Sequence, residues 1–224
     1  MVFSQMKQRL LLLDTACVCD ADKEQGRLGV VDPAIGSVRR GLKLVGRAYT
    51  VRCHEDFLTV IKALRDAGAG EVIVIDSQNS RRALTGELFP TEARRKGLAG
   101  IVIDGFCRDT AAIRELDVPY YARGVNCAAG TTDRLFETQV TINCGGVSVN
   151  PGDILFGDDD GLVVGTERDF SQTIPLAEQI QDKEQTILEG MRQGRSLFRM
   201  LNFDEHCAKL EAGEPSKLQF WSET

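Results

Sequence analysis

The sequence predicts an α/β fold: a layered α/β/β sandwich with a partly parallel sheet, crossover helices and a smaller hairpin sheet. Strand-like and helix-like segments alternate between residues 43 and 104, which is the pattern that builds right-handed parallel crossovers. The segments 71–76 and 99–104 are continuously apolar, as expected of strands covered on both faces. After residue 140, short strand-like runs are separated by Gly-Gly, Asn-Pro-Gly and Asp-Asp-Asp-Gly, which are hairpin signals.

The composition fits one globular domain over residues 1–224. Hydrophobic residues make up 42% of the 224 positions, and no break in composition separates two domains. The net charge of −6 is spread among mixed acids and bases, so the sequence does not predict a nucleic-acid partner. The run at residues 10–13 is far shorter than the roughly 20 apolar residues of a membrane span. We therefore expect a soluble, cytoplasmic protein without membrane contact.

The seven cysteines are odd in number and scattered, which does not suggest a disulfide framework. Most are expected to be reduced, buried and hydrophobic in character. A zinc site is disfavoured because Cys17 and Cys19 form the one close pair and the two histidines, His54 and His206, lie far apart in the sequence. His54 has no second ligand or nucleophile nearby, so it is expected to serve as a hydrogen-bonding loop residue.

The first half of the chain yields its elements in a regular order. Residues 4–24 show helical spacing up to a stop at Gln25-Gly26, and residues 32–36 read as a loop because of their proline and glycine. A strand at 43–53, an amphipathic helix at 57–67 and a strand at 71–76 follow. The polar loop after this strand carries Arg81 and Arg82, either of which could bind a carboxylate of a ligand; a solvated basic loop explains them equally well.

Residues 84–109 are the stretch around which the chain is organised. They predict a helix at 86–96, a turn through Gly97, a buried strand at 99–104 and a polar loop beginning at Gly105. Ligands of open α/β sheets bind at the carboxyl ends of the strands. This strand should therefore deliver three polar side chains to a binding rim, namely Asp104, Arg108 and Asp109.

These residues suit a small acid bound together with a metal. Arg108 can bind a planar carboxylate through two donors, and Asp109 can hold a hard divalent cation through oxygen. The backbone amides at the start of the helix beginning at Gly86 form a natural anion seat. Cys107, next to Arg108, has no placed base, so a structural role is favoured over that of a nucleophile.

The second half of the chain predicts short strands followed by helices. Residues 158–161 lack the ligand pattern of a calcium loop and are expected to form a tight turn. A long charged helix at 170–191 needs a partner surface, either its own core or a neighbouring subunit. The remaining predicted elements are strands at 119–122, 140–144, 147–149, 154–156 and 162–164, a helix at 197–203, and a polar tail at 212–224 that contains Trp221.

The stretch resembles the family of class II pyruvate aldolases that cleave 4-hydroxy-4-methyl-2-oxoglutarate, whose relatives include the regulator of ribonuclease activity A. The resemblance rests on Gly-Glu-Leu at 86–88, Gly-Ile-Val-Ile-Asp-Gly at 100–105 and the pair Arg108-Asp109. It extends more thinly over residues 14–194, through the segments 32–35, 80–84, 119–124 and 151–153 and through Asp76. Ala112 departs from the pattern, because family aldolases often carry an acid there, and this leaves the identity of the substrate open.

The resemblance implies a divalent-metal-dependent lyase that cleaves 4-hydroxy-2-oxo acids. Mg²⁺ or Mn²⁺ would bind the carboxylate and keto oxygen of a pyruvyl unit, with Asp109 as metal ligand and Arg108 as the catalytic residue at the keto oxygen. The substrate carboxylate would be bound by the amides of Gly86, Glu87, Leu88 and Phe89. Cleavage would leave pyruvate enolate, which also arises when oxaloacetate loses carbon dioxide, so oxaloacetate decarboxylase activity is expected as well.

The resemblance also implies an assembly. The enzymes that this chain resembles form trimers or pairs of trimers whose sites lie between subunits, so the resemblance implies a homotrimer or hexamer. Residues 170–224 would be a helical C-terminal extension packing on a neighbouring subunit. Glu184 would reach the neighbour's metal, although the same helix offers other carboxylates at Glu178, Asp182 and Glu189. The alternative is a noncatalytic binding protein like the ribonuclease regulator; proteins of that kind generally lack the aspartate of the Arg-Asp pair, which this chain keeps as Asp109.

Overall fold

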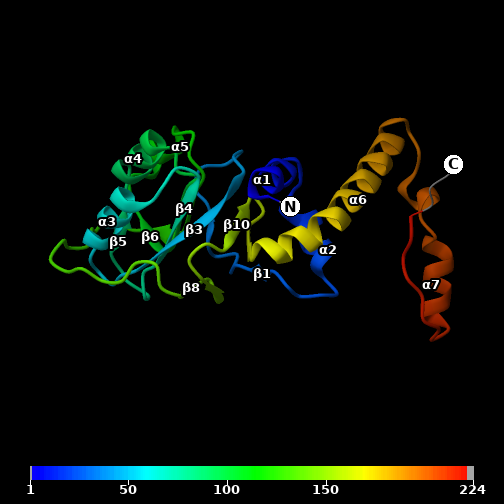
Figure 1. The fold of residues 1–224 in the computed structure, drawn as a ribbon. Helices are drawn as coiled ribbons and strands as arrows, with labels where there is room; N and C mark the ends of the chain where they lie inside the picture. The colour runs from blue at the N-terminus through cyan, green and yellow to red at the C-terminus, as the bar shows by residue number, and fades with distance from the viewer. Residues whose placement is uncertain (1, 221–224) are drawn as a thin grey trace. The chain divides into compact units, whose positions relative to one another are not determined.

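A computed structural model describes residues 2–220 of the chain. The chain divides into two compact units, Met1–Ala177 and Glu178–Thr224. The first unit contains the whole sheet, and helices account for most of the regular structure in the second (Figure 1). None of the helices within residues 2–220 is both long and apolar enough to cross a membrane.

The first unit is built on a mixed sheet whose strands follow the order β1-β11-β10-β3-β4-β6-β7-β2, with β5 paired to β6 beside this path. The central strands β3, β4, β6 and β7 are parallel, whereas the outer pairs are antiparallel. The strands are β1 Gly29–Val30, β2 Gly36–Ser37, β3 Leu44–Arg52, β4 Glu71–Asp76, β5 Ala83–Thr85, β6 Gly100–Cys107, β7 Tyr120–Val125, β10 Ile154–Gly157 and β11 Leu162–Gly165. The prediction of a partly parallel sheet is confirmed.

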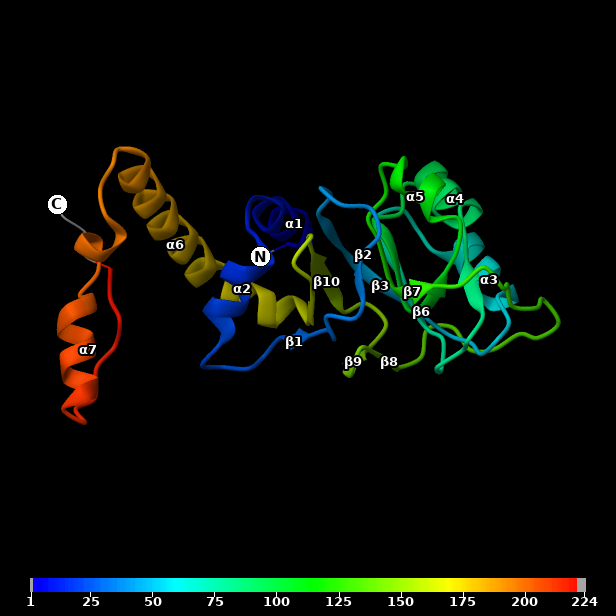
Figure 2. The same ribbon diagram turned by 180° about the vertical axis from the view of Figure 1, so that it is seen from behind.

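Helices cover one face of the sheet and a small hairpin covers the other (Figures 1 and 2). On the helical side, α3 (Leu58–Asp66), α4 (Leu88–Lys96) and α5 (Thr110–Arg114) contribute to one apolar cluster. On the opposite side, the hairpin of β8 (Ile142–Cys144) and β9 (Val147–Val149) contributes to a second cluster. This arrangement is the predicted α/β/β sandwich.

Strand β4 shows why the central strands read as continuous apolar runs. Ile73 and Ile75 belong to the cluster under the helices, whereas Val72 and Val74 belong to the cluster under the hairpin. All four side chains are fully buried. Because a strand presents alternate residues to opposite faces, a strand covered on both sides needs apolar residues at every position.

The single helix predicted at 4–24 is wrong: the structure has two helices, α1 (Phe3–Leu12) and α2 (Thr15–Asp22). Leu13 and Asp14 between them are extended, with ψ near 163° for both. The Asp14 carboxylate accepts a hydrogen bond of 2.8 Å from the amide of Cys17 and so caps α2. An aspartate is a preferred helix N-cap, and here it restarts a helix that hydrophobic spacing alone presents as continuous.

The central strand β6 is longer than predicted. It runs to Cys107, whereas the sequence predicted a strand ending at Asp104 and a loop from Gly105. Its pairing with β4 ends at Asp104, its last residues Phe106 and Cys107 pair with β5, and its pairing with β7 shifts register between Ile103 and Phe106. The helix predicted from Gly86 begins at Leu88, because Gly86 and Glu87 form the turn that leads into α4.

The hairpin strands and tight turns of the second half are confirmed. Tyr120 to Val125 form β7, which is three residues longer at its end than predicted. The turn at 158–161 closes through a hydrogen bond of 3.1 Å from the Asp158 amide to the carbonyl oxygen of Gly161. The carboxylate of Asp158 is buried and binds the amide and hydroxyl of Thr15 at 2.8 and 2.6 Å, so it anchors α2 to the sheet.

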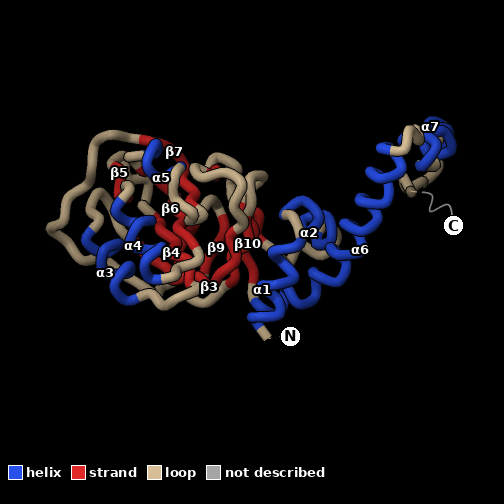
Figure 3. Tube along the Cα trace, turned by 90° about the horizontal axis from the view of Figure 1, so that it is seen from above, coloured by secondary structure: helices blue, strands red, loops and turns tan. Residues whose placement is uncertain are grey.

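The long predicted helix is α6 (Glu167–Arg192), which contributes residues to both units. The helix predicted at 197–203 is wrong, because a 3₁₀ turn at Leu197–Met200 precedes a separate helix, α7 (Phe203–Glu211). In Figure 3, α6 and α7 are blue and the loops are tan. Trp221, which was predicted in the polar tail, lies outside the described residues.

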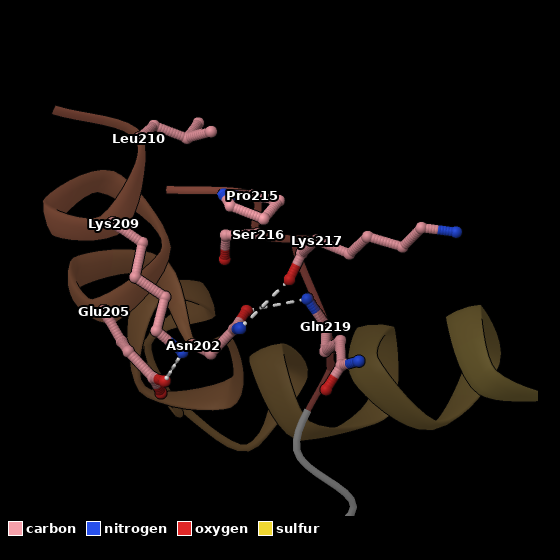
Figure 4. A pocket seen from close by; sticks show the side chains of 8 residues that line it. All are labelled: Asn202, Glu205, Lys209, Leu210, Pro215, Ser216, Lys217 and Gln219. Atoms are coloured by element: carbon pink, nitrogen blue, oxygen red, sulfur yellow. Dashed lines mark hydrogen bonds and ion pairs between the residues drawn. The ribbon is translucent and has the colours of Figure 1, made fainter. Parts of the chain in front are cut away.

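In the second unit, Asn202 fastens the tail against the start of α7 (Figure 4). Its side-chain amide donates to the carbonyl oxygen of Lys217 at 3.1 Å, and its side-chain oxygen accepts from the amide of Gln219 at 2.7 Å. Glu205 and Lys209 pair at 2.6 Å beside it. A cavity of about 660 Å³ opens here. Because these polar groups bind one another, we attribute the cavity to the way in which the tail folds back against α7.

Candidate functional site

Of the five non-glycine residues with positive φ in the described part of the chain, all but Gln139 follow three neighbouring parallel strands. Glu55 lies after β3 with φ 53°, Gln78 and Asn79 lie after β4 with φ 49° and 58°, and Asp109 lies after β6 with φ 57°. Such backbone conformations are costly for side chains other than glycine, and they concentrate at functional sites. The carboxyl edge of the parallel sheet is therefore the candidate site.

Arg108 and Asp109 stand together at the end of β6. Nε of Arg108 lies 3.5 Å from Oδ2 of Asp109, and the two side chains are 44% and 40% exposed. The amide of Arg108 donates to the carbonyl oxygen of Thr85 at 3.1 Å, which ties the pair to the end of β5. Both groups are therefore held in place while remaining open to a ligand.

Gly86 provides the close approach that brings this pair against the start of α4. A Cβ atom at this position would collide with Oδ2 of Asp109 and would lie 3.1 Å from Cγ of Arg108. The amide of Glu87 donates to the same Oδ2 at 3.3 Å. The predicted rim residues from both ends of the 84–109 stretch therefore meet in space.

The anion seat predicted at Gly86, Glu87, Leu88 and Phe89 is only partly open. The Glu87 amide is used by Asp109, and the amide of Phe89 donates to the carbonyl oxygen of Gly86 at 3.1 Å. Among the described residues, the amides of Gly86 and Leu88 have no partner. Two amides at the helix start are thus available to an anion, where the helix dipole also favours negative charge.

A cavity of about 80 Å³ opens beside the Arg108–Asp109 pair. The rings of Phe57 and Phe89 form an edge-to-face pair there, with centroids 6.0 Å apart and planes at 82°. The cavity is lined by Phe57, Ala83, Leu84, Thr85, Gly86, Leu88, Phe89, Arg108, Asp109 and Ala129. Five of these residues were not predicted as site residues from the sequence, namely Phe57, Ala83, Leu84, Thr85 and Ala129. For Phe57, the available signal was its position shortly after the end of a parallel strand.

A buried cluster of polar side chains lies close to the Arg108–Asp109 pair. The hydroxyl groups of Thr85 and Tyr120 are hydrogen-bonded, and Tyr120 also contacts the thiol of Cys107. Cys107 is fully buried, and this burial raises the pKa of its thiol to about 11. A thiol that stays protonated at neutral pH is a poor nucleophile, which agrees with the structural role expected for Cys107.

Asp104 does not belong to the rim, so that part of the prediction is wrong. Its carboxylate accepts from Nε of Arg123 at 2.6 Å and from the amide of Gly145 at 2.7 Å. Arg123 also pairs with Asp32 at 2.8 Å, and these hydrogen bonds raise the pKa of its guanidinium. Since Asp104 lies within β6 rather than after it, its side chain joins the strands to the hairpin layer and not to Arg108.

The two arginines of the 77–82 loop differ in position. Both are exposed, and the carbonyl oxygen of Arg81 accepts from the side-chain amide of Asn126 at 2.5 Å. Nη1 of Arg82 lies 3.5 Å from the carbonyl oxygen of Ala129, which lines the cavity. Arg82 is therefore near the rim of the site without lining the cavity itself.

The donor set fits an open magnesium-type site. Within residues 2–220, no group of three or more His, Cys, Asp or Glu side chains could enclose a metal ion. Mg²⁺ is commonly held by one or two carboxylates with water and substrate oxygens completing its shell, and the exposed carboxylate of Asp109 meets that need. Glu184 lies in the segment of α6 that belongs to the second unit, and its role as a metal ligand stays a prediction.

Comparisons with known proteins place these residues in context. A family model described as RraA-like, Aldolase/RraA, matches residues 15–164. A protein of Halalkalibacterium halodurans, provisionally named as a 4-hydroxy-4-methyl-2-oxoglutarate aldolase, is 36% identical over 154 residues. The match covers 68% of this chain and 72% of that protein.

Two solved structures share the fold. The RNA-processing inhibitor RraA from Thermus thermophilis has 31% sequence identity and a TM-score of 0.62, with 67% of this chain and 92% of that chain covered. An uncharacterized protein from Pseudomonas syringae pv. tomato has 26% identity and a TM-score of 0.76, with 88% and 96% covered. The names of these similar proteins differ, so the site residues must decide between functions.

Proposed function

The chain belongs to the RraA-like family of aldolases and RraA proteins, and within it we propose that this protein is a divalent-metal-dependent carbon–carbon lyase acting on 4-hydroxy-2-oxo acids. The observation that carries the proposal is the Arg108–Asp109 pair, held at 3.5 Å at the end of β6 and against the start of α4. Arg108, Asp109, Gly86 and Leu88 all line one small cavity there, and the amides of Gly86 and Leu88 have no partner among the described residues. This set complements a 2-oxo acid, which presents a carboxylate and a keto oxygen side by side.

Each group has a role in binding the pyruvyl unit. The amides of Gly86 and Leu88 receive the substrate carboxylate, since both are available at a helix start. The guanidinium of Arg108 donates to the keto oxygen and to a neighbouring water. Asp109 holds the metal, Mg²⁺ or Mn²⁺, which when bound would supply positive charge next to the substrate oxygens.

The cleavage breaks the C3–C4 bond. The C4 hydroxyl gives its proton to the water beside Arg108, and its oxygen keeps the electron pair that becomes the second bond of the new carbonyl group. The C3–C4 electron pair moves into the pyruvate unit, which becomes an enolate and then takes a proton at C3. Arg108 stabilises the negative charge that develops on the enolate oxygen, which is a major source of rate in such reactions. Oxaloacetate gives the same enolate on loss of carbon dioxide, so it is expected to be decarboxylated.

The second candidate is a noncatalytic regulator, which the similarity to the Thermus RNA-processing inhibitor favours. The two candidates predict different results in one assay. Pyruvate release is measured for a panel of 4-hydroxy-2-oxo acids and for oxaloacetate, with and without Mg²⁺. A lyase releases pyruvate from at least one compound in a Mg²⁺-dependent manner, whereas no release from any of them would favour the regulator.

Asp109→Asn tests the assigned metal ligand. The substitution removes the charge and changes little volume, so Mg²⁺-dependent oxaloacetate decarboxylation should be lost while the unfolding midpoint stays the same. Asp117→Asn is the matched control. Asp117 is exposed, pairs with Arg39 and precedes β7, so it lies at the amino-terminal ends of the parallel strands, away from the site. Activity of Asp109→Asn within a factor of two of the parent would remove Asp109 from the site.

A further inference from the structure

Thr85 is a buried polar residue of the site to which the proposed function gives no role. It lines the cavity beside the Arg108–Asp109 pair and is only 2% exposed. Its carbonyl oxygen accepts a hydrogen bond of 3.1 Å from the amide of Arg108. In the sequence it directly precedes Gly86, where the amides assigned to the substrate carboxylate begin. Thr85 is therefore connected both to the charged pair and to the anion seat.

The side chain of Thr85 lies on the side of the sheet on which the cavity opens. Its hydroxyl group is hydrogen-bonded to the hydroxyl group of Tyr120. Tyr120 is fully buried in the apolar cluster beneath the helices. Phe57 and Phe89, which line the cavity, pack against the same cluster. The Thr85 hydroxyl group and the cavity therefore share one layer of the fold.

The direction of the Thr85–Tyr120 hydrogen bond follows from the second partner of Tyr120. The tyrosine hydroxyl group contacts the thiol of Cys107 as well as the hydroxyl group of Thr85. It has one hydrogen to donate, and a hydroxyl oxygen is a stronger acceptor than a thiol sulfur. Tyr120 therefore donates to Thr85, and the thiol can donate to the tyrosine oxygen. The hydrogen of the Thr85 hydroxyl group is not used in this contact.

That hydrogen has no acceptor in the described part of the chain. Within residues 2–220, Tyr120 is the one hydrogen-bond partner of the Thr85 hydroxyl group. A hydroxyl group can donate one hydrogen bond and accept two, and a buried donor without an acceptor is unfavourable. Because Thr85 lines the cavity, a ligand there can supply the missing acceptor.

We propose that the Thr85 hydroxyl group donates a hydrogen bond to the carboxylate of the pyruvyl unit, as a third donor beside the amides of Gly86 and Leu88. Tyr120 is the positioning residue that holds this hydroxyl group in the required direction. The inference rests on the proposed function and adds these two residues to its site. The substrate carboxylate keeps its charge throughout the cleavage, so the contact stabilises the bound substrate and the transition state about equally. It therefore lowers KM without raising kcat.

Thr85→Val tests the hydroxyl group, because valine has nearly the same shape. The Kd of pyruvate in the presence of Mg²⁺, measured by isothermal titration calorimetry, and the KM for oxaloacetate should both rise about tenfold, as expected for the loss of a hydrogen bond to a charged group. The kcat should stay within about a factor of two. Thr85→Ser keeps a hydroxyl group and should keep the Kd within about threefold of the parent value.

Thr173→Val is the control for the loss of a buried threonine hydroxyl group. Thr173 is 1% exposed in α6, and its hydroxyl group donates to the carbonyl oxygen of Asp169 at 3.0 Å, outside the cavity lining. The Kd of pyruvate should not change in this variant.

Tyr120→Phe tests the positioning residue. Without the tyrosine donor the Thr85 hydroxyl group can turn away from the ligand, so the Kd of pyruvate should rise about threefold with little change in kcat. Tyr121→Phe is the matched control. Tyr121 is the next residue of β7, lies in the cluster under the hairpin, and donates from its buried hydroxyl group to the carbonyl oxygen of Asp158 at 2.8 Å. Equal effects of the two changes on the Kd would contradict the positioning role of Tyr120.

The outcomes separate failure of this inference from failure of the proposed function. If the parent binds pyruvate and decarboxylates oxaloacetate, an unchanged Kd in Thr85→Val would refute the inference alone. A fall in kcat without a change in Kd would also overturn it, because the hydroxyl group would then act on the enolate oxygen. Should Thr85→Val fail to fold, the comparison of Tyr120→Phe with Tyr121→Phe decides. A parent that neither binds pyruvate nor decarboxylates oxaloacetate would refute the proposed function, and the inference with it.

Discussion

At the scale of single residues, the proposed lyase reaction would depend on the shape of the Arg108 side chain as well as on its charge. A planar guanidinium can donate to an oxyanion and to a water in fixed directions, whereas the ammonium of lysine is a point charge on a flexible stem. Arg108→Lys should therefore lose turnover nearly as severely as Arg108→Ala, by a factor on the order of one hundred or more, as when an oxyanion donor is removed. Steady-state decarboxylation of oxaloacetate measures this loss.

Arg95→Lys provides the comparison for that experiment. Arg95 is exposed and pairs with Glu92 on the surface of α4, so its replacement should alter turnover by less than twofold. If Arg108→Lys kept most of the parent activity, Arg108 would contribute general positive charge and not a directed pair of hydrogen bonds.

Gly86 is expected to be as sensitive as the charged residues although it carries no side chain. The Cβ atom added by Gly86→Ala would push against Oδ2 of Asp109 and the side chain of Arg108, so the pair would have to move. We expect a loss of turnover of at least tenfold, since small displacements of catalytic groups are costly. Gly36→Ala in β2 adds a Cβ atom with nothing within 4 Å and serves as the control. Equal activities of the two variants would show that the close approach at Gly86 is not required.

At the scale of elements, Asp56 joins the start of α3 to the loop at 131–134. One carboxylate oxygen accepts from the amide of Leu58 at 2.9 Å, and the other accepts from the Thr131 hydroxyl and from the amides of Asp133 and Arg134 at 2.7, 2.6 and 3.1 Å. Burial alone would raise the pKa of Asp56, but these hydrogen bonds outweigh it and hold the pKa below its usual value. The ionised form is therefore the one that stabilises the fold.

This shift makes the effect of Asp56→Asn depend on pH. Because the pKa is lowered in the folded state, the stabilisation is present above the unfolded pKa of about 3.9 and is lost as the pH falls through the folded value. The difference in the free energy of unfolding between parent and variant should be largest above about pH 5 and should shrink as the pH falls from about 4 through the lower pKa of the folded state. Urea unfolding at several pH values measures the difference. A difference that stays constant over this range would mean that charge plays no part in the contact.

Local sequence patterns predicted which helices and strands exist better than they predicted the residues at which each one begins and ends. Strand β4 was predicted with its observed limits because a polar residue closes each end of its apolar run. Strand β6 was predicted too short, since its last residues depend on pairing with β5, a neighbour that only the folded chain supplies. The break between α1 and α2 was missed because Asp14 acts through a side-chain hydrogen bond and not through hydrophobic spacing. Pattern thus identifies elements, and tertiary partners decide their limits.

At the scale of the whole molecule, the order of parallel strands was enough to bring Arg108, Asp109 and Gly86 to one edge. It could not predict the cavity wall, because Phe57 and Ala129 come from segments more than 70 positions apart that meet only through packing. The same limit explains Asp104, whose partners Arg123 and Gly145 come from β7 and the hairpin turn. The sequence could predict which charged residues lie near strand ends. It could not predict which layer of the fold each of their side chains contacts.

The last prediction concerns assembly and rests on Glu184. If the site is shared between subunits, Asp109 comes from one chain and Glu184 from α6 of its neighbour. Asp109→Asn and Glu184→Ala homo-oligomers should then both be inactive, and subunits mixed under conditions that allow exchange should regain part of the activity, because some interfaces combine two intact half-sites. Decarboxylation measured after mixing, with the oligomer size checked by light scattering, tests this arrangement. Glu189→Ala, a change five residues further along the helix, serves as the control and should keep its activity. A fully active monomer, or two inactive variants whose mixed oligomers show no recovery, would mean that the site is built within one chain.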